Sequence, residues 1–165
     1  MSRPPLVLEA ATEDDVDPLV ELERSCHTHP WSARNFRDEL ADPGRGRLIV
    51  LRAPLDAAGP GRGIVAYCAY QVVAAEMHLL NLTVAPALQR GGLGGILLTR
   101  ALEQGARRGA ERVFLEVRRS NRAAQGLYER FGFATMAVRR DYYADPREDA
   151  LLLARGSGAG PSNAP

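Results

Sequence analysis

The sequence contains no lysine, and all 21 of its basic residues are arginine. Two classes of chemistry depend on a lysine side chain. A Walker-type phosphate loop binds phosphate through its lysine, and enzymes of the pyridoxal and aldolase types form a Schiff base through a lysine amine. The absence of lysine excludes both classes.

Cysteine, excess charge and long apolar runs are also scarce. Cys26 and Cys68 are too few for a disulfide framework and lack the spacing of metal ligands. The formal net charge of +1 argues against extended contact with nucleic acid. No run approaches the roughly 20 apolar residues of a membrane helix, and the N-terminus lacks a signal-peptide pattern. We therefore expect a soluble, cytoplasmic protein with neither a nucleic acid nor a membrane as its partner.

The 165 residues, 45% hydrophobic and 25% charged, are typical of one globular domain. Apolar periodicity and turn residues predict an α/β fold in the order βααβββ-αβαββ, with a single mixed sheet flanked by helices. We expect this domain over residues 1–155, an exposed hairpin loop at 53–62 and a flexible tail at 156–165. The expected strands are 6–10, 47–52, 63–70, 77–84, 111–117, 133–140 and 149–154, and the expected helices are 12–25, 32–40, 93–108 and 121–131.

A glycine-rich segment joins the strand at 77–84 to the helix at 93–108. Its glycines allow a ligand to approach the backbone, and the helix N-terminus presents N–H groups that suit a pyrophosphate. The dinucleotide-binding fingerprint fails because Leu97 stands where its third glycine belongs. A glycine-rich turn without a ligand is the alternative. The segment consists of Gln89, Arg90, Gly91, Gly92, Leu93, Gly94 and Gly95.

The segment from Gln89 to Gly94 resembles the Q/R-x-x-G-x-G/A motif of the GCN5-related N-acetyltransferase (GNAT) superfamily, and the order of elements resembles the GNAT fold. Five further segments resemble the RimI-type ribosomal-protein alanine N-acetyltransferases within that superfamily. They are His29-Pro-Trp-Ser, Leu82-Thr-Val-Ala-Pro, Leu115-Glu-Val-Arg-Arg-Ser-Asn, Leu127-Tyr-Glu-Arg-Phe-Gly-Phe and Arg140-Asp-Tyr-Tyr.

The resemblance implies acetyl-CoA as co-substrate. Its pyrophosphate would lie against residues 89–95, and its pantetheine arm and thioester carbonyl against the backbone of Leu82, Thr83 and Val84. Gly95 stands where close relatives commonly have arginine, which puts one phosphate contact in doubt. The implied acceptor is the N-terminal alanine of the eighteenth small-subunit ribosomal protein. Asp141 replaces an expected asparagine, which leaves the substrate preference open.

Acetyl transfer to an amine requires a base for the amine, donors for the thioester carbonyl and an acid for the departing thiolate. Glu116 lies between Leu115 and Val117 in a strand, so its side chain points to the sheet face opposite to theirs. The resemblance implies that Glu116 is the proton acceptor. The alternative is a carboxylate paired with Arg118 or Arg119.

Asn121 and Tyr128 are seven residues apart, so they share a helix face at a separation of about 10 Å along the axis. The resemblance implies that Asn121 contacts the cofactor and that Tyr128 is the proton donor. The alternatives are an N-cap for Asn121 and a core aromatic ring for Tyr128.

The resemblance also implies that Trp31, Tyr142 and Tyr143 line a groove for the first residues of the acceptor, although strand packing competes for the two tyrosines. The segment from Cys26 to His29 lacks a third and a fourth metal ligand, so we expect no metal. Neither cysteine has a base partner in the sequence pattern, so we expect direct transfer in a ternary complex.

Three other functions remain open. The chain could acetylate several protein N-termini with relaxed specificity, or it could acetylate a small-molecule amine, because a fold does not fix the acceptor. A catalytically silent acetyl-CoA-binding module is the non-enzymatic alternative. Such a module should lack the base or the acid, whereas this chain has both Glu116 and Tyr128.

Overall fold

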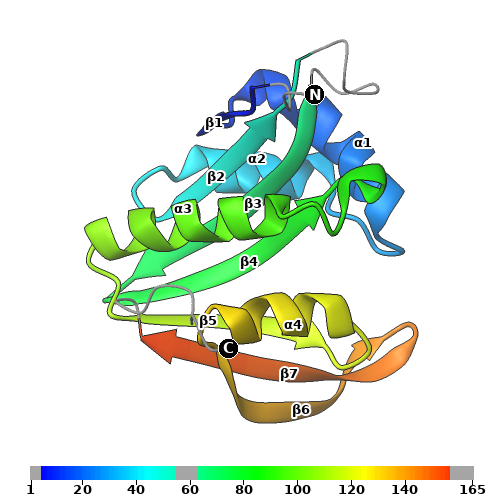
Figure 1. The fold of residues 1–165 in the computed structure, drawn as a ribbon, viewed down its shortest axis with the longest axis vertical. Helices are drawn as coiled ribbons and strands as arrows, with labels where there is room; N and C mark the ends of the chain where they lie inside the picture. The colour runs from blue at the N-terminus through cyan, green and yellow to red at the C-terminus, as the bar shows by residue number, and fades with distance from the viewer. Residues whose placement is uncertain (1–4, 55–62, 157–165) are drawn as a thin grey trace. The chain divides into compact units, whose positions relative to one another are not determined.

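The computed structural model describes residues 5–54 and 63–156 of the chain (Figure 1). Seven strands form a mixed sheet in the order β1-β2-β3-β4-β5-β7-β6. β4 and β5 pair in parallel, whereas the pairs β1–β2, β2–β3, β5–β7 and β6–β7 are antiparallel. This sheet and its helices confirm the predicted α/β fold. The elements are β1 (Val7–Ala10), η1 (Glu13–Asp15), α1 (Val16–Cys26), α2 (Ala33–Ala41), β2 (Gly46–Arg52), β3 (Ile64–Val73), β4 (Glu76–Val84), η2 (Pro86–Leu88), α3 (Leu93–Arg107), β5 (Arg112–Arg118), α4 (Arg122–Arg130), β6 (Ala134–Ala144) and β7 (Arg147–Gly156).

Contacts are concentrated in two compact units. The first unit comprises Met1–Gln71 and Asn81–Ala101, and the second unit comprises Val72–Leu80 and Leu102–Pro165. β3, β4 and α3 therefore each contribute residues to both units. The single domain predicted over residues 1–155 stays a prediction.

The first unit has its apolar core between α1, α2 and the strands β2 and β3. Figure 1 shows α3 crossing the front of these strands, with α1 and α2 on the far side. Val16 and Leu19 follow the helical period of α1 and are fully buried with Phe36 of α2. Ser32 caps α2, because its hydroxyl accepts a hydrogen bond from the backbone N–H of Asn35 at 3.3 Å.

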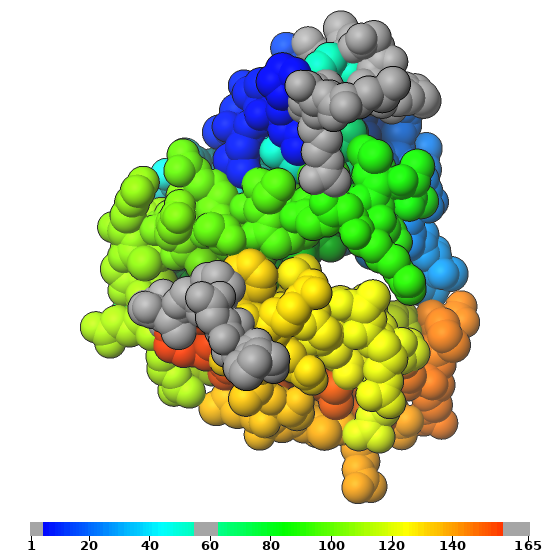
Figure 2. Space-filling view, viewed as in Figure 1, coloured from blue at the N-terminus to red at the C-terminus, as the bar shows by residue number. Residues whose placement is uncertain are grey.

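The second unit contains β5, β6, β7 and α4 together with the end of α3, the end of β3 and the first part of β4. Gly105 of α3 lies so close to β4 that an added Cβ would be 2.4 Å from the sulfur of Met77, so a larger residue here would displace the Met77 side chain. Figure 2 shows the turn between β6 and β7, coloured orange, at the surface of this unit. The hairpin therefore presents its tip to solvent.

Several boundaries differ from the sequence-based expectation, and β3 runs three residues past the expected end at Tyr70. The helix predicted from Thr12 begins as the 3-10 turn η1, because Asp15 accepts a hydrogen bond from the backbone N–H of Thr12 at 2.9 Å. β6 extends four residues past Arg140, and register shifts with a positive φ of 52° at Asp141 accommodate the extra length.

β7 runs to Gly156, one residue into the segment predicted as a tail. The rest of that tail and residues 55–62 of the predicted loop lie outside the described residues. None of the described helices is long and apolar enough to cross a membrane.

Replacement of Phe36 by alanine should lower the free energy of unfolding by about 3–5 kcal/mol. The Phe36 ring is fully buried, with its centroid 5.4 Å from that of Trp31 and 5.3 Å from that of Tyr67. Urea denaturation measures the change. Val7→Ala is the control, because Val7 is 51% exposed and its replacement should change stability by less than about 0.5 kcal/mol. Equal effects of both substitutions would contradict this account of the core.

Candidate functional site

The glycine-rich segment forms the entry to α3 in the first unit. Arg90 and Gly92 adopt positive φ angles of 64° and 86°. An added Cβ at Gly92 would meet nothing within 4 Å, so glycine is required there by the backbone angle and not by crowding. The first helical hydrogen bond runs from Ile96 N to Gly92 O at 3.2 Å. The first-turn N–H groups therefore lack helical acceptors, which suits an anion such as a pyrophosphate.

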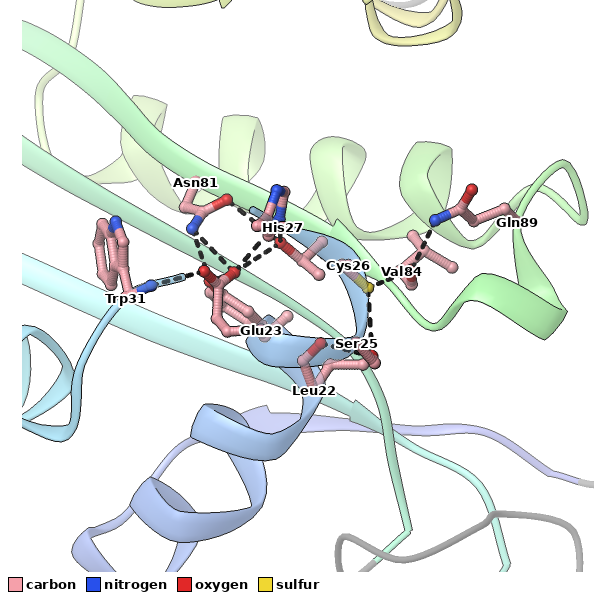
Figure 3. A network of polar contacts seen from close by, with 11 residues as sticks. Leu22, Glu23, Ser25, Cys26, His27, Trp31, Asn81, Val84 and Gln89 are labelled. Atoms are coloured by element: carbon pink, nitrogen blue, oxygen red, sulfur yellow. Dashed lines mark hydrogen bonds and ion pairs between the residues drawn. The ribbon is translucent and has the colours of Figure 1, made fainter. Parts of the chain in front are cut away.

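Hydrogen bonds connect the end of β4 to this segment and to the end of α1. The backbone carbonyl of Val84 accepts a hydrogen bond from Nε2 of Gln89 at 3.1 Å. The thiol of Cys26 lies 3.5 Å from the same oxygen (Figure 3). The predicted cofactor-contacting residues Val84 and Gln89 are therefore brought together, and the Gln89 side chain stabilises the turn.

A buried polar network lies beside the same stretch of β4, and the sequence analysis missed it. Its centre is Glu23 of α1, whose side chain is 1% exposed. Oε1 of Glu23 accepts hydrogen bonds from the hydroxyl of Tyr67, from Nδ2 of Asn81 at 3.1 Å and from Oγ1 of Thr83 at 3.0 Å. Burial is the main cause of the raised pKa of Tyr67, and the neighbouring Glu23 carboxylate raises this pKa further. Asn81 and Thr83 alternate with Leu82, so Leu82 faces the other side of β4.

The network also reaches the loop between α1 and α2 (Figure 3). Oε2 of Glu23 accepts a hydrogen bond from the backbone N–H of Trp31 at 2.9 Å. Nε2 of His27 lies 3.0 Å from Oγ1 of Thr83 and 3.4 Å from Oε1 of Glu23. Because the Thr83 hydroxyl donates to Glu23, its oxygen is placed to accept from His27. The sequence contains a signal for this network, because Glu23 follows Val16 by seven residues and so lies on the buried face of α1.

Glu116 of β5 lies in the second unit with two partners from β6. Its carboxylate is 27% exposed and pairs with a guanidinium nitrogen of Arg139 at 3.0 Å. A hydrogen bond to Glu116 raises the pKa of Tyr142. The structure therefore brings together the predicted base and one predicted acceptor-binding residue. The alternative pairing of Glu116 with Arg118 or Arg119 is wrong.

Arg118 and Arg119 have other partners on β7. Arg118 pairs with Glu148 at 2.9 Å, and Arg119 lies 3.9 Å from the carboxylate of Asp149. The guanidinium carbon of Arg118 also lies 3.9 Å from the ring centroid of Tyr143, a cation–π contact. β7 reaches these arginines because it is the neighbour of β5 in the sheet.

The helix α4 carries the other two predicted residues of the second unit. The side chain of Asn121 accepts a hydrogen bond from the backbone N–H of Ala124 at 3.1 Å, so the N-cap alternative is confirmed. Tyr128 is buried, and its ring packs edge-on against Phe133 with centroids 5.6 Å apart. The contacts of Asn121 and Tyr128 with a cofactor remain predictions.

The cysteines and histidines form no metal site within the residues that the structure describes. Burial raises the pKa of Cys26, and the Glu23 carboxylate adds to this effect. Cys68 is fully buried in β3, and burial raises its pKa as well. Both thiols are therefore held in the unreactive protonated form at neutral pH.

Known proteins are similar to this chain in sequence and in fold. The sequence profile of the acetyltransferase (GNAT) family matches residues 16–133. The ribosomal protein bS18-alanine N-acetyltransferase of Escherichia coli (strain K12) is 36% identical over 142 residues, which cover 85% of this chain and 90% of that protein. The protein of the same name from Haemophilus ducreyi is 34% identical over 151 residues, which cover 90% and 98%. The crystal structure of the Escherichia coli ribosomal-protein-S18-alanine N-acetyltransferase matches with a TM-score of 0.80 and 32% identity, covering 98% of this chain and 99% of that one.

Both thiols should react with iodoacetamide more slowly at pH 8 than a cysteine in an unstructured peptide. A raised pKa leaves less thiolate at a given pH, and thiolate is the reacting form. Mass spectrometry of alkylated Cys26 and Cys68 over time measures the rates, and the protein unfolded in guanidinium chloride is the control. Alkylation of folded Cys26 at the rate of the unfolded protein would contradict the assigned environment.

Proposed function

This chain belongs to the acetyltransferase (GNAT) family, and we propose that it transfers the acetyl group of acetyl-CoA to the N-terminal alanine of ribosomal protein bS18. The observation that carries the proposal is the similarity to the two bS18-alanine N-acetyltransferases, which extends over at least 85% of this chain. The matched region contains the glycine-rich segment, Glu116, Asn121 and Tyr128. A ribosomal acceptor places the reaction in the cytoplasm.

The entry to α3 fits the diphosphate of acetyl-CoA. Its first-turn N–H groups and the positive end of the helix dipole favour an anion, and the open space at Gly92 lets a ligand approach the backbone. Arg90 adds a positive charge to this segment. We assign the pantetheine arm to the backbone of residues 82–84 and a further contact to Asn121. Acetyl-CoA supplies the acetyl group as a thioester.

Glu116 is the proposed proton acceptor. An N-terminal ammonium has a pKa of about 7.7–8.0, so roughly a tenth of it is neutral at pH 7. Glu116 takes the proton that the amine loses as its nitrogen forms a bond with the acetyl carbon. Arg139 and Tyr142 hold the Glu116 carboxylate in place for this task. A lysine acceptor, with a pKa near 10.4, would need far more help.

Tyr128 is the proposed proton donor. When the bond between the acetyl carbon and sulfur breaks, the thiolate takes the proton of the Tyr128 hydroxyl. Trp31, Tyr142 and Tyr143 are assigned to the first residues of the acceptor. The raised pKa values of Cys26 and Cys68 support direct transfer without an acyl-cysteine intermediate.

The unsubstituted protein should acetylate a peptide with the bS18 N-terminal sequence on its free alanine. Mass spectrometry compares it with a peptide that has a blocked N-terminus and an internal lysine, and with a peptide that begins with another residue. Acetylation confined to the bS18-type peptide supports the proposal. Equal reaction of both free N-termini would indicate relaxed specificity. Binding of acetyl-CoA without transfer to any peptide would contradict a protein acceptor.

Glu116→Gln and Tyr128→Phe should each lower kcat/KM, with the loss of general acid–base catalysis reducing the rate by about 10²- to 10⁴-fold. Binding of acetyl-CoA, measured by calorimetry, should persist in both variants. Glu111→Gln is the matched control, because Glu111 lies exposed just before the same strand. A Glu116→Gln enzyme as active as this control would exclude Glu116 as the base.

A further inference from the structure

The carboxylate of Glu23 divides its two oxygens between two parts of the first unit. Oε1 accepts from side chains of β3 and β4, namely Tyr67, Asn81 and Thr83. Nε2 of His27, just after α1, also lies 3.4 Å from Oε1. Oε2 accepts from one backbone group, the N–H of Trp31 at 2.9 Å. One buried side chain therefore joins the end of β4 to the loop between α1 and α2 (Figure 3).

At the Trp31 end this connection is a backbone hydrogen bond, and the Trp31 side chain packs against the core of the first unit. The loop is short, running from His27 to Ser32 between α1 and α2. Pro30 has no N–H to donate. The backbone donor to Oε2 of Glu23 is the N–H of the next residue, Trp31. The Trp31 ring packs at a tilt against Phe36, with centroids 5.4 Å apart. A backbone hydrogen bond to a charged, buried acceptor is stronger than one between neutral groups, so it controls where Trp31 lies.

We infer that Glu23 is a positioning residue that holds Trp31 for the acceptor peptide through Oε2, while Oε1 anchors the carboxylate to β4. The inference rests on the proposed function in one respect, the assignment of Trp31 to the acceptor. Glu23 acts through Trp31 and does not itself meet the substrate, because its side chain is buried. A purely structural carboxylate would stabilise the fold without affecting peptide binding in particular.

Replacement of Glu23 by glutamine tests the roles of the two carboxylate oxygens separately. A glutamine has one acceptor oxygen and one donor NH₂ group. With its oxygen in the place of Oε1, the three side-chain donors keep their acceptor and the NH₂ group faces the N–H of Trp31, donor to donor. The opposite orientation would leave three donors facing an NH₂ group, which costs more. Glu23→Gln therefore releases Trp31 and preserves the contacts with β4.

The expected effect of Glu23→Gln is a rise of about tenfold in the KM for the bS18-type peptide, the equivalent of one lost hydrogen bond to a charged group. The KM for acetyl-CoA should stay within about twofold of the unsubstituted value. Trp31 is the single tryptophan of the chain, so its fluorescence reports on the loop alone. Acrylamide should quench this fluorescence more strongly in the variant.

Two control variants separate positioning from stability. Tyr67→Phe removes a donor to Oε1 but leaves the Trp31 contact, so it should lower the melting temperature without raising the peptide KM or the quenching. Glu39→Gln changes a carboxylate of α2 that accepts from the side chain of Gln71 at 2.9 and 3.1 Å, outside the network. It should leave both readouts unchanged.

Two results would overturn the inference. One is unchanged quenching of Trp31 in Glu23→Gln, which would show that Oε2 does not hold the loop. The other is a peptide KM that rises as much in Tyr67→Phe as in Glu23→Gln, which would show a general loss of structure. Failure of the proposed function is distinguishable, because the unsubstituted protein would then acetylate no bS18-type peptide while Trp31 quenching still responded to Glu23→Gln.

A measurement on the unsubstituted protein carries the test if Glu23→Gln does not fold. Amide hydrogen exchange followed by NMR should show a Trp31 N–H that exchanges more slowly than the N–H of Thr28, because its acceptor is buried. The Thr28 amide of the same loop is the reference. Exchange of Trp31 as fast as that of Thr28 would overturn the inference.

Discussion

The need of one buried carboxylate for hydrogen-bond donors organises the first unit. Burying a charge is costly unless it is paired and hydrogen-bonded, and Glu23 meets this demand with donors from three separate segments: β3, β4 and the loop before α2. The helix α1, the two strands and the loop must all be in place before the charge is satisfied. Local secondary structure and the position of Trp31 therefore depend on a common interaction.

The fold could be predicted from the sequence because its signals are local. The buried stripe of α1, the Ser32 cap and the glycine after each of the helices α3 and α4 act within a few residues of their position, and each is found where the pattern indicated. β3 and the hairpin of β6 and β7 are exceptions, because their strands run longer than predicted. The hairpin shows the reason. Its length depends on bulges in the pairing of two strands, and pairing is not visible in the periodicity of one strand.

The site was predicted less completely, because its contacts join segments far apart in the sequence. The glycine-rich segment is contiguous, so its glycines and the helix N-terminus could be recognised together. The partner of Glu116 could not, since Arg139 lies 23 residues away on β6 and reaches it only through the strand order. The neighbouring arginines were the natural expectation, but β7 supplies acidic partners for both. Glu23 lies on the apolar stripe of α1, but glutamate is usually exposed, so its sequence position alone does not predict a buried network.

Two glutamates of this chain lie in environments that differ in the conditions a catalytic base must meet. A carboxylate that acts as a base must be reachable by the amine and must take up a proton without leaving buried donors unsatisfied. Glu23 fails both conditions, because it is buried and its oxygens accept from at least four donors. Glu116 is partly exposed, and its partners Arg139 and Tyr142 lie on the exposed strand β6, where solvent can replace a lost contact. The environment of Glu23 therefore excludes it as a base, whereas that of Glu116 is compatible with the proton acceptor proposed above.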